Sequence, residues 1–345
     1  SRYGALNAFM VQSEDPTGIL TEELKQKART SIGNTLETPV IDYDADITIG
    51  NTRTLTIADS ENTSKMVQIT FATYAWGFTI APAMYMNNEI GIQRDFETKM
   101  MKYIYKFAQK LDEVALAALA ANKTQVLKNK LLYDFSTNAV NAKWLERENV
   151  FGDLEVMMGA NDFFGQLHII GDPGVESIMR KLEQHGLYND ENKQNEFGNK
   201  IVHLTNNLAA TPGKYAQGYA VNAGSLGMLT RFERDCLLGT VSGDGHEWGI
   251  ATLPLLNMPV GTYFYDSVGD YHTIAGAATG DMVRTRKEHY GFAVDVAFLT
   301  SYNSDNTTLP SPILAFNISS ENAAYAKPVV VVNSEKSPVN TKTIA

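Results

Sequence analysis

The chain contains very little cysteine and little positive charge. Its 345 residues include a single cysteine, Cys236, which excludes an internal disulfide framework and any zinc cluster built from several cysteines of one chain. Lysine and arginine number 29 against 39 aspartates and glutamates, which gives a net charge of -10. Because tight phosphate binding requires lysine and arginine to displace counterions, this balance disfavours tight nucleic-acid binding by the chain as a whole.

Long apolar runs are also missing. The first residues, SRYGALNAFMVQSEDP, have no apolar core like that of a secretory signal, so we expect no signal peptide. Residues 66–88 carry no charge and are long enough to resemble a membrane span. They contain Pro82 and several Gln, Asn and Thr residues, however, and their apolar residues alternate in twos. We therefore predict a strand and a turn into a helix, and no membrane contact.

No signature of catalysis or ligand binding is recognisable. The sequence has no Walker loop, no dinucleotide glycine fingerprint and no nucleophile elbow. The stretch SGDGHEWG offers Asp244, His246 and Glu247 as candidate metal ligands, but it lacks the calcium-loop pattern and a second histidine at helical spacing. We interpret it as an exposed glycine-rich loop, and we expect no catalytic residue, no cofactor and no bound metal.

The histidines are dispersed along the chain, one to each predicted element. They are His168, His185, His203, His246, His272 and His289. No two are close enough in sequence to indicate a shared metal or a catalytic dyad, although folding could still bring some of them together.

A long hairpin is the most distinctive predicted feature. In RTLTIADSENTSKMVQITF, residues 53–71, apolar residues alternate with polar ones on both sides of the polar tip ADSENTSK. This is the pattern of half-buried strands. The period of two continues to Ile80, so each arm runs to roughly 12 residues, or about 40 Å. A two-stranded hairpin is marginal in water, so its apolar face must lie on its own core or on a neighbour.

Helices are predicted on both sides of this hairpin. TEELKQKART predicts a short helix capped by Thr21. From Gln93 to Leu127, apolar residues recur at spacings of three and four while lysines and glutamates take the other side. That pattern is typical of a long amphipathic helix, about 43 Å from Gln93 to Ala121.

The rest of the chain predicts a mixed α+β organisation. A helix at about 151–164, an apolar strand at 167–171 and a helix at 175–186 form an α–β–α passage. From Gly218 onward the sequence predicts mostly strands, separated by turn-forming Gly, Asp and Pro. After Ser320 the pattern is lost, and we expect a largely flexible tail.

This order of elements resembles the major capsid protein of tailed double-stranded DNA bacteriophages, which has the Hong Kong 97-type fold. The likeness covers about residues 38–319, and it concerns the order of the elements and the character of short stretches of sequence. The stretches that carry it are FTIAPAMYMNNEIG from Phe78, HIIGDPGVESIMRKLEQHGLYND from His168, LPLLNMPVGTYFYDSVGDYHTIAGAATGDMVRTRKEHY from Leu253, and PSPILAFNIS near Ser311.

The resemblance implies an α+β capsid fold with an N-terminal arm, an extended hairpin called the E-loop, a peripheral P domain built on a spine helix, and an axial A domain of mixed α/β structure. The expected divisions are the arm at 1–41, the E-loop at 42–80, the P domain at 81–150 with the spine helix at about 87–127, the A domain at 151–275, closing P-domain strands at 276–320 and a tail at 321–345. The E-loop residues expected at inter-subunit contacts are Leu55, Ile57, Asp59, Glu61, Lys65, Val67, Ile69 and Phe71.

The function implied is structural and not enzymatic. The chain would assemble through hexamers and pentamers into an icosahedral head that encloses packaged double-stranded DNA. Its expected partners are other copies of itself, a portal, scaffold or head-decoration proteins, and DNA through non-specific contacts. Its expected location is the virion, after assembly in the host cytoplasm.

Some points remain open at the level of sequence. Lys65 could donate to a crosslink of the kind that some members form, but no residue here identifies the partner asparagine or the assisting acid. Two other functions also stay open: an encapsulin-type shell that holds cargo, and a soluble enzyme with an α/β domain and a β-rich domain.

Overall fold

The chain divides into two compact units. The computed structural model describes residues 2–31, 33, 35–42, 63–82, 89–186, 200–209, 211–240, 245–273, 282–301 and 307–321. Unit 1 comprises Ser1–Ala8, Leu119–Ala223 and Asp305–Ala345, and unit 2 comprises Phe9–Ala118 and Gly224–Ser304. The chain therefore passes repeatedly from one unit to the other.

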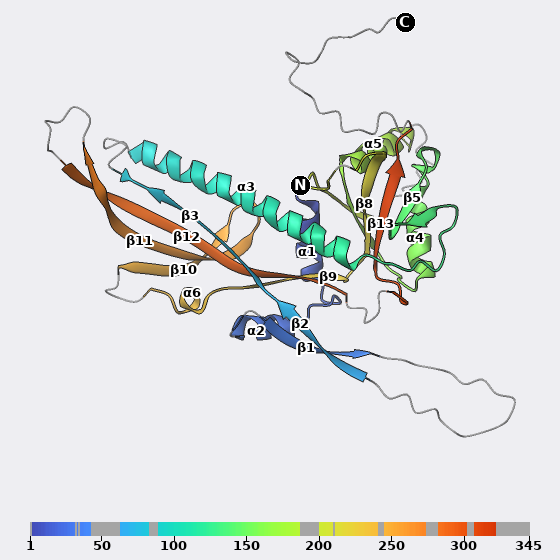
Figure 1. Cartoon of the computed structure of the whole chain (residues 1–345), viewed down its shortest axis with the longest axis horizontal. Helices are drawn as coiled ribbons and strands as arrows, with labels where there is room; N and C mark the ends of the chain where they lie inside the picture. Colours follow the sequence, from blue (N-terminus) through green and yellow to red (C-terminus); the bar gives the residue numbers. More distant parts are fainter. Residues whose placement is uncertain are drawn as a thin grey trace, which may run out of the picture. The chain divides into compact units, whose positions relative to one another are not determined.

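Unit 2 is built on an antiparallel sheet of five strands (Figure 1). These are β3 (Ala72–Ile80), β9 (Leu226–Arg231), β10 (His246–Leu253), β11 (Met258–Thr273) and β12 (Met282–Thr300). The strand order is β10-β11-β12-β3, with β9 pairing the last part of β12. Strands β11 and β12 are long, at 16 and 19 residues.

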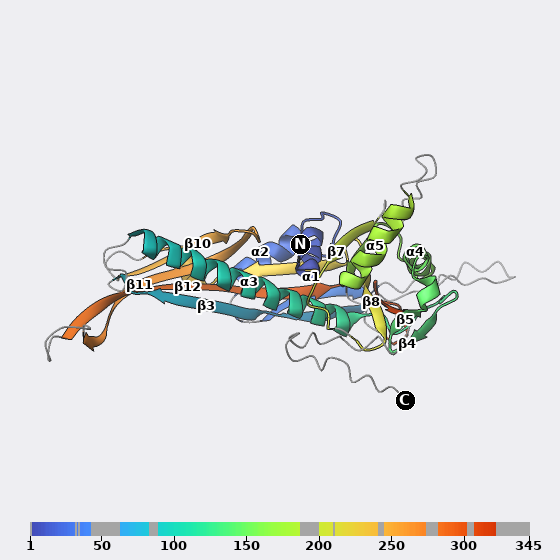
Figure 2. The ribbon, with the colours of Figure 1, turned by 90° about the horizontal axis from the view of Figure 1, so that it is seen from above.

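The predicted spine helix is present as α3 (Glu89–Asn122), which is 34 residues long. It lies along one face of the sheet of unit 2 (Figures 1 and 2). Aromatic rings join the two: Phe107 lies 4.4 Å from Trp76, and Phe96 lies 5.4 Å from Phe78, between ring centroids. The helix ends five residues before the expected Leu127, because beyond Asn122 the backbone N–H of Thr124 donates to the carbonyl of Ile313 instead.

The N-terminal part of unit 2 forms one helix and a two-stranded ribbon. Helix α2 (Glu22–Thr30) begins as predicted, with the Thr21 side chain accepting a hydrogen bond from the N–H of Leu24. Strands β1 (Thr35–Asp42) and β2 (Thr63–Thr70) pair antiparallel along their whole length. We call this pair the ribbon; the segment that joins its strands, residues 43–62, lies outside the described part of the chain.

The expected hairpin boundaries, 42–80, are wrong at both ends. Pairing begins at Thr35, opposite Thr70, so the first arm starts seven residues earlier than expected. The second arm ends at Thr70, because the next strand, β3, leaves the ribbon and pairs with β12. The apolar residues shift at this point from odd positions, ending at Phe71, to even positions beginning at Tyr74, so a change of phase accompanies the change of partner.

Unit 1 contains a mixed sheet of six strands. They are β4 (Asp134–Ser136), β5 (Ala139–Ala142), β6 (Leu167–Gly171), β7 (Lys200–Leu204), β8 (Lys214–Asn222) and β13 (Ile313–Ser319), in the order β4-β5-β13-β8-β6-β7. Its core packs α4 (Val150–Ala160) and α5 (Pro173–Gly186) against one side of this sheet. Leu154, Ile169, Ile178 and Phe316 are all buried there. A 3-10 turn at Trp144–Glu146 precedes α4.

The N-terminus and the division into domains each differ from expectation. Residues 1–41 were expected as an arm with no core of its own, yet α1 (Gly4–Ser13) buries Leu6 and Phe9 almost completely. The division into units also departs from the expected A domain at 151–275 and closing strands at 276–320. Strands β9 to β11 belong to unit 2, and β13 belongs to unit 1.

Candidate functional site

The two faces of the ribbon differ in character. Residues directly opposite each other in an antiparallel pair lie on the same face. At the base of one face Leu36 lies opposite Ile69, and each is only 4% exposed. Further out on this face Val67 is partly exposed, whereas Gln68, on the other face, is exposed. Among the side chains that the structure describes, the apolar face is therefore buried at its base and only partly covered at Val67.

The expected inter-subunit residues fall into three groups. Leu55, Ile57, Asp59 and Glu61 lie outside the described residues. Lys65 lies in β2 opposite Val40, and Val67 lies opposite Thr38. Ile69 and Phe71 are buried within their own chain, where they were expected to contact a neighbour.

Ile69 and Phe71 belong to a small apolar core inside unit 2. The residues of this core, which we call the ribbon core, are Leu20, Ala28, Leu36, Ile69, Phe71, Leu229 and Ala297. They come from the segment before α2, from α2 itself, from the ribbon and from β9 and β12. For these two residues the expected inter-subunit role is corrected: helix α2 and the sheet already cover the base of the ribbon.

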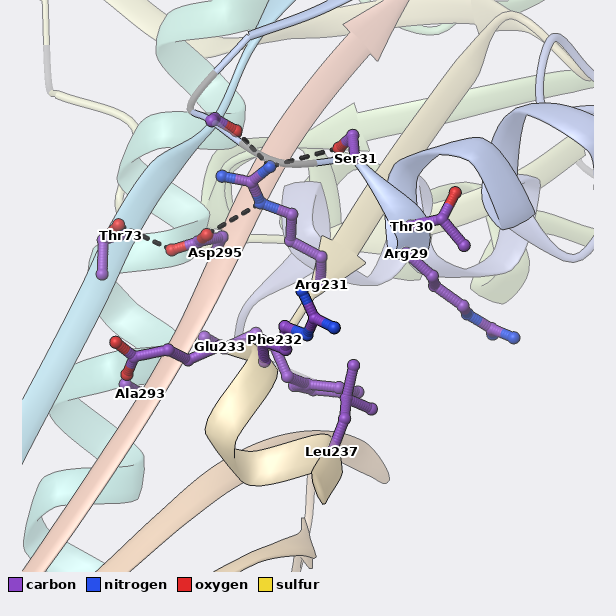
Figure 3. A pocket seen from close by; sticks show the side chains of 13 residues that line it. Arg29, Thr30, Ser31, Thr73, Arg231, Phe232, Glu233, Leu237, Ala293 and Asp295 are labelled. Carbon is purple, nitrogen blue, oxygen red and sulfur yellow. Dashed lines mark hydrogen bonds and ion pairs between the residues drawn. The ribbon is translucent and has the colours of Figure 1, made fainter. Parts of the chain in front are cut away.

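An arginine fixes the ribbon core to the sheet (Figure 3). The guanidinium of Arg231 donates through Nε to Asp295 at 2.8 Å and through Nη1 to Ser31 Oγ at 3.2 Å and to the carbonyl of Gly33. It also lies 4.4 Å from the centre of the Phe71 ring. Asp295 in turn accepts a hydrogen bond from Thr73 Oγ1 at 2.6 Å.

This arrangement joins four segments through one buried cation. Arg231 is only 6% exposed, so its charge requires the carboxylate of Asp295 close by. Stacking on an aromatic ring adds about 0.5–2 kcal/mol to such an interaction. The base of the ribbon is therefore held in one position on the sheet.

An open pocket of about 650 Å³ lies beside this ion pair. Arg29 and Thr30 from the end of α2 form one wall (Figure 3). Arg234 and Leu237 from α6 (Arg234–Leu238) form another, and Arg231 lines it beside its partner. With charged, hydroxyl and apolar groups together, this pocket suits a polypeptide segment better than a small apolar ligand.

The SGDGHEWG stretch is not a glycine-rich loop over its whole length. His246 and Glu247 lie in β10, where they pair with Tyr265 and Phe264, and Asp244 lies outside the described residues. The ring of His246 stacks on Tyr263 and shares a hydrogen bond with its hydroxyl. In the described part of the chain no three His, Cys, Asp or Glu side chains gather as a metal site would require.

Folding does bring two of the dispersed histidines together in unit 1. His168 of β6 and His203 of β7 are each 4% exposed, and their rings stack with centroids 5.3 Å apart. Nδ1 of His168 lies 3.0 Å from Nε2 of His203, whose Nδ1 lies 3.1 Å from Nδ2 of Asn7. Burial, with a smaller contribution from His168, lowers the pKa of His203 to about 4.

Sequence reasoning missed both buried polar groups. A signal for the first was available: Asp295 is the only charge within FAVDVAFL, and a charge in an apolar strand needs a partner. For the histidines no local signal exists, since 35 residues separate them. None of the helices in the described ranges has the length and hydropathy needed to cross a membrane.

Comparison with known proteins finds similarity in structure. No protein-family model matches the sequence, and no curated protein matches it. The capsid structure of cyanophage P-SCSP1u shares 10% identity over 85% of each chain, with a TM-score of 0.46. The capsid of Ralstonia phage GP4 shares 10% identity over 86% of each chain, with a TM-score of 0.45. The capsid of Myoviridae phage XM1 shares 12% identity over 89% of this chain and 97% of that one, with a TM-score of 0.40. At such identities, function has to rest on this chain's own residues.

Proposed function

We propose that the chain is the major capsid subunit of a tailed double-stranded DNA bacteriophage, a structural protein that assembles through hexamers and pentamers into an icosahedral head. Its partners are then other copies of itself, a portal, scaffold or head-decoration proteins, and packaged DNA through non-specific contacts. It acts in the virion after assembly in the host cytoplasm.

The ribbon is the observation that carries this proposal. Its strands pair with each other, and its apolar face is buried at the base, at Leu36 and Ile69, but partly exposed at Val67, the next apolar residue of β2 on this face. An isolated two-stranded hairpin is marginal in water, so the outer part of this face needs a surface to cover it. A neighbouring subunit supplies that surface, and closed symmetry repeats the contact throughout a shell.

The order of elements supports the same proposal. After α1 the chain forms α2, the ribbon, β3 and the 34-residue α3, then passes into unit 1, and later returns to unit 2 through strands that include the long β11 and β12. The resemblance implies this order for an arm, an E-loop, a spine helix, an axial domain and closing strands.

Two single substitutions at neighbouring positions test the proposal. Val67→Asp places a charge on the apolar face, where burying a valine against a neighbour stabilises by about 1.5–3 kcal/mol. Gln68→Asp adds the same charge one residue away, on the exposed face. We expect Val67→Asp to reduce particle yield at least tenfold while circular dichroism still reports a folded subunit. Gln68→Asp should assemble like the wild type, as judged by light scattering and electron micrographs.

Several results would contradict this proposal. If the wild type remains monomeric or dimeric at high concentration, with and without the phage's assembly proteins, the chain is not a shell subunit. If both variants assemble equally well, the ribbon does not make the contact. The contents of purified particles separate the two shell functions, since DNA indicates a phage head and a co-purifying protein indicates an encapsulin-type compartment.

A further inference from the structure

The outer edge of β3 has none of the usual protections of an edge strand. Strand β3 is the last strand of the sheet of unit 2, at the opposite margin from β10 (Figure 2). Its nine residues, Ala72–Ile80, include no charged side chain and no proline, and they pair with β12 without a bulge. Proteins usually protect an edge with such features, because its unpaired backbone groups recruit other strands.

Two contacts show which backbone groups of β3 point out of the sheet. A methyl group at Gly77 would lie 2.8 Å from the carbonyl oxygen of Tyr290, so this oxygen points toward β3, where Tyr290 pairs with Phe78. The backbone groups of Phe78 therefore point into the sheet, and those of its two neighbours along the strand point outward. The second contact agrees, since Nζ of Lys99 donates to the carbonyl of Thr79 at 3.1 Å.

The outward-pointing backbone groups are open to a partner. They belong to Thr73, Ala75, Gly77 and Thr79, all of which are exposed. Within the part of the chain that the structure describes, the N–H and carbonyl groups of Ala75 and Gly77 have no hydrogen-bond partner. These two residues alone offer two donors and two acceptors to an added strand.

Lysines of α3 follow this edge. Lys99, Lys106 and Lys110 are separated by seven and four residues, which places them on one side of the helix. Lys99 reaches Thr79 near one end of β3. Burial raises the pKa of Tyr74, near the other end, and the charge of Lys110 opposes that rise. The helix rises about 16 Å from Lys99 to Lys110, which is about the length of strand from Thr79 to Tyr74.

Carboxylates of α3 balance these lysines only in part. Asp95 pairs with Lys99 at 2.6 Å, and Glu113 pairs with Lys110 at 3.1 Å. Both are pairs within one helix at its surface, which are weak and exchange partners readily. Lys106 has no carboxylate partner among the described residues. The side of α3 that lies over the edge of β3 therefore carries an excess of positive charge.

This charge favours an acidic partner over a second copy of the chain. If two β3 edges paired with each other, the lysines of the two α3 helices would face one another, and like charges at such a contact repel. A strand that carries carboxylates would instead meet opposite charge along its length.

We propose that the outer edge of β3 binds an extended acidic segment of another protein, which adds a strand to the sheet beside the lysines of α3. Main-chain hydrogen bonds to Ala75 and Gly77 supply affinity, as in other cases of strand addition. Carboxylates at alternate positions of the segment lie on the α3 side, where they meet Lys106 and Lys110. The site goes beyond the capsid function and does not depend on it, since all of it lies within unit 2 of one chain.

Fluorescence anisotropy with the unassembled full chain tests the site. The probe is a short labelled peptide, blocked at both ends, with valine at its centre, a glutamate two residues to either side and threonine elsewhere. We expect it to bind at least about tenfold more tightly than the same peptide with lysine in place of glutamate. Added salt should reduce this difference.

A substitution at Ala75 tests the backbone contact. Ala75→Pro removes an N–H that points out of the sheet, so β3 keeps its bonds to β12, and proline is tolerated on edge strands for this reason. It should weaken binding of the acidic peptide at least about tenfold, because an added strand loses a donor and meets the proline ring. Ala75→Ser keeps the N–H and is the matched control, which should bind like the wild type.

A second variant keeps the test decisive if Ala75→Pro fails to fold. Lys106 and Lys110 are both exposed, so Lys106→Glu combined with Lys110→Glu should fold like the wild type. This double variant should prefer the lysine peptide to the glutamate peptide.

Amide hydrogen exchange locates the bound peptide. Binding should slow exchange at Ala75 and Gly77, whose N–H groups point outward, and should leave Trp76, whose N–H points into the sheet, unchanged. Failure of the acidic peptide to bind, equal binding of the two peptides, or protection elsewhere in the chain would each overturn the proposal. So would a dimer of the wild type that Ala75→Pro abolishes, since a second copy would then occupy the edge.

Discussion

Truncating Phe71 tests whether the base of the ribbon belongs to its own subunit. Its ring is 4% exposed in the ribbon core and lies 4.4 Å from the guanidinium of Arg231. Replacing a buried phenylalanine by alanine typically costs about 3–5 kcal/mol. With a urea dependence of about 3 kcal/mol/M for a chain of this size, the unfolding midpoint of Phe71→Ala should fall by about 1–1.7 M. Met66→Ala, on the exposed face of the ribbon and 57% exposed, should shift it by less than about 0.2 M.

The assay is urea unfolding of unassembled subunits, followed by circular dichroism and by tryptophan fluorescence, since Trp76 lies in the sheet of the same unit. If Phe71→Ala unfolds at the wild-type midpoint but fails to form particles, then Phe71 contacts a neighbour and the ribbon core has been misassigned. The same reasoning explains why a charge at Phe71 is a poor probe of assembly, because it would unfold the subunit first. Val67 is the position where assembly can be tested separately.

Four further substitutions have defined outcomes. Asp295→Asn removes the counter-charge of Arg231 and should destabilise unit 2 by about 3–5 kcal/mol in thermal or urea unfolding; a loss below about 1 kcal/mol would mean that Arg231 is solvated. Asp172→Asn should be at least as stable as the wild type at pH 7, because burial raises the pKa of this carboxyl above its ordinary value and stability is lost as pH rises through the folded-state pKa. This advantage in stability over the wild type should shrink below about pH 4, where Asp172 is protonated in both the folded and the unfolded state. If the difference in stability instead widens in acid, folding lowers the pKa of Asp172 and the reasoning is wrong. Gly174→Ala would place a methyl group 2.1 Å from the carbonyl oxygen of Tyr215 and should impair folding, whereas Gly152→Ala, with no atom within 4 Å, should be neutral or slightly stabilising in a melting curve.

Local patterns predicted the elements whose causes are local. Thr21 caps α2 as expected, the strand at 167–171 has the predicted bounds, and the amphipathic period identified α3. Each of these depends on interactions within a few residues along the chain, which a sequence displays directly.

The change of strand partner was missed. Thr70 pairs with β1 while Ala72 pairs with β12. The sequence carries a trace of this change, since the apolar residues move from odd positions up to Phe71 to even positions from Tyr74, but it does not show which strand becomes the new partner. Helix α1 was missed because GALNAFMVQS is apolar nearly all round, so it carries no amphipathic period. For the candidate site, the sequence indicated the ribbon and its apolar face. It could not show that Ile69 and Phe71 meet α2 and β9, which depends on tertiary contacts.

The position of β13 has a consequence for how the chain is made. This strand lies inside the sheet of unit 1, parallel to β5 on one side and antiparallel to β8 on the other, yet it follows all the other described strands along the chain. Until it is synthesised, β5 and β8 each present an unpaired edge, and such edges promote aggregation. Unit 1 therefore cannot complete its sheet until Ile313–Ser319 has been synthesised, and a nascent chain stalled before Ile313 should bind chaperones far more than the released protein does.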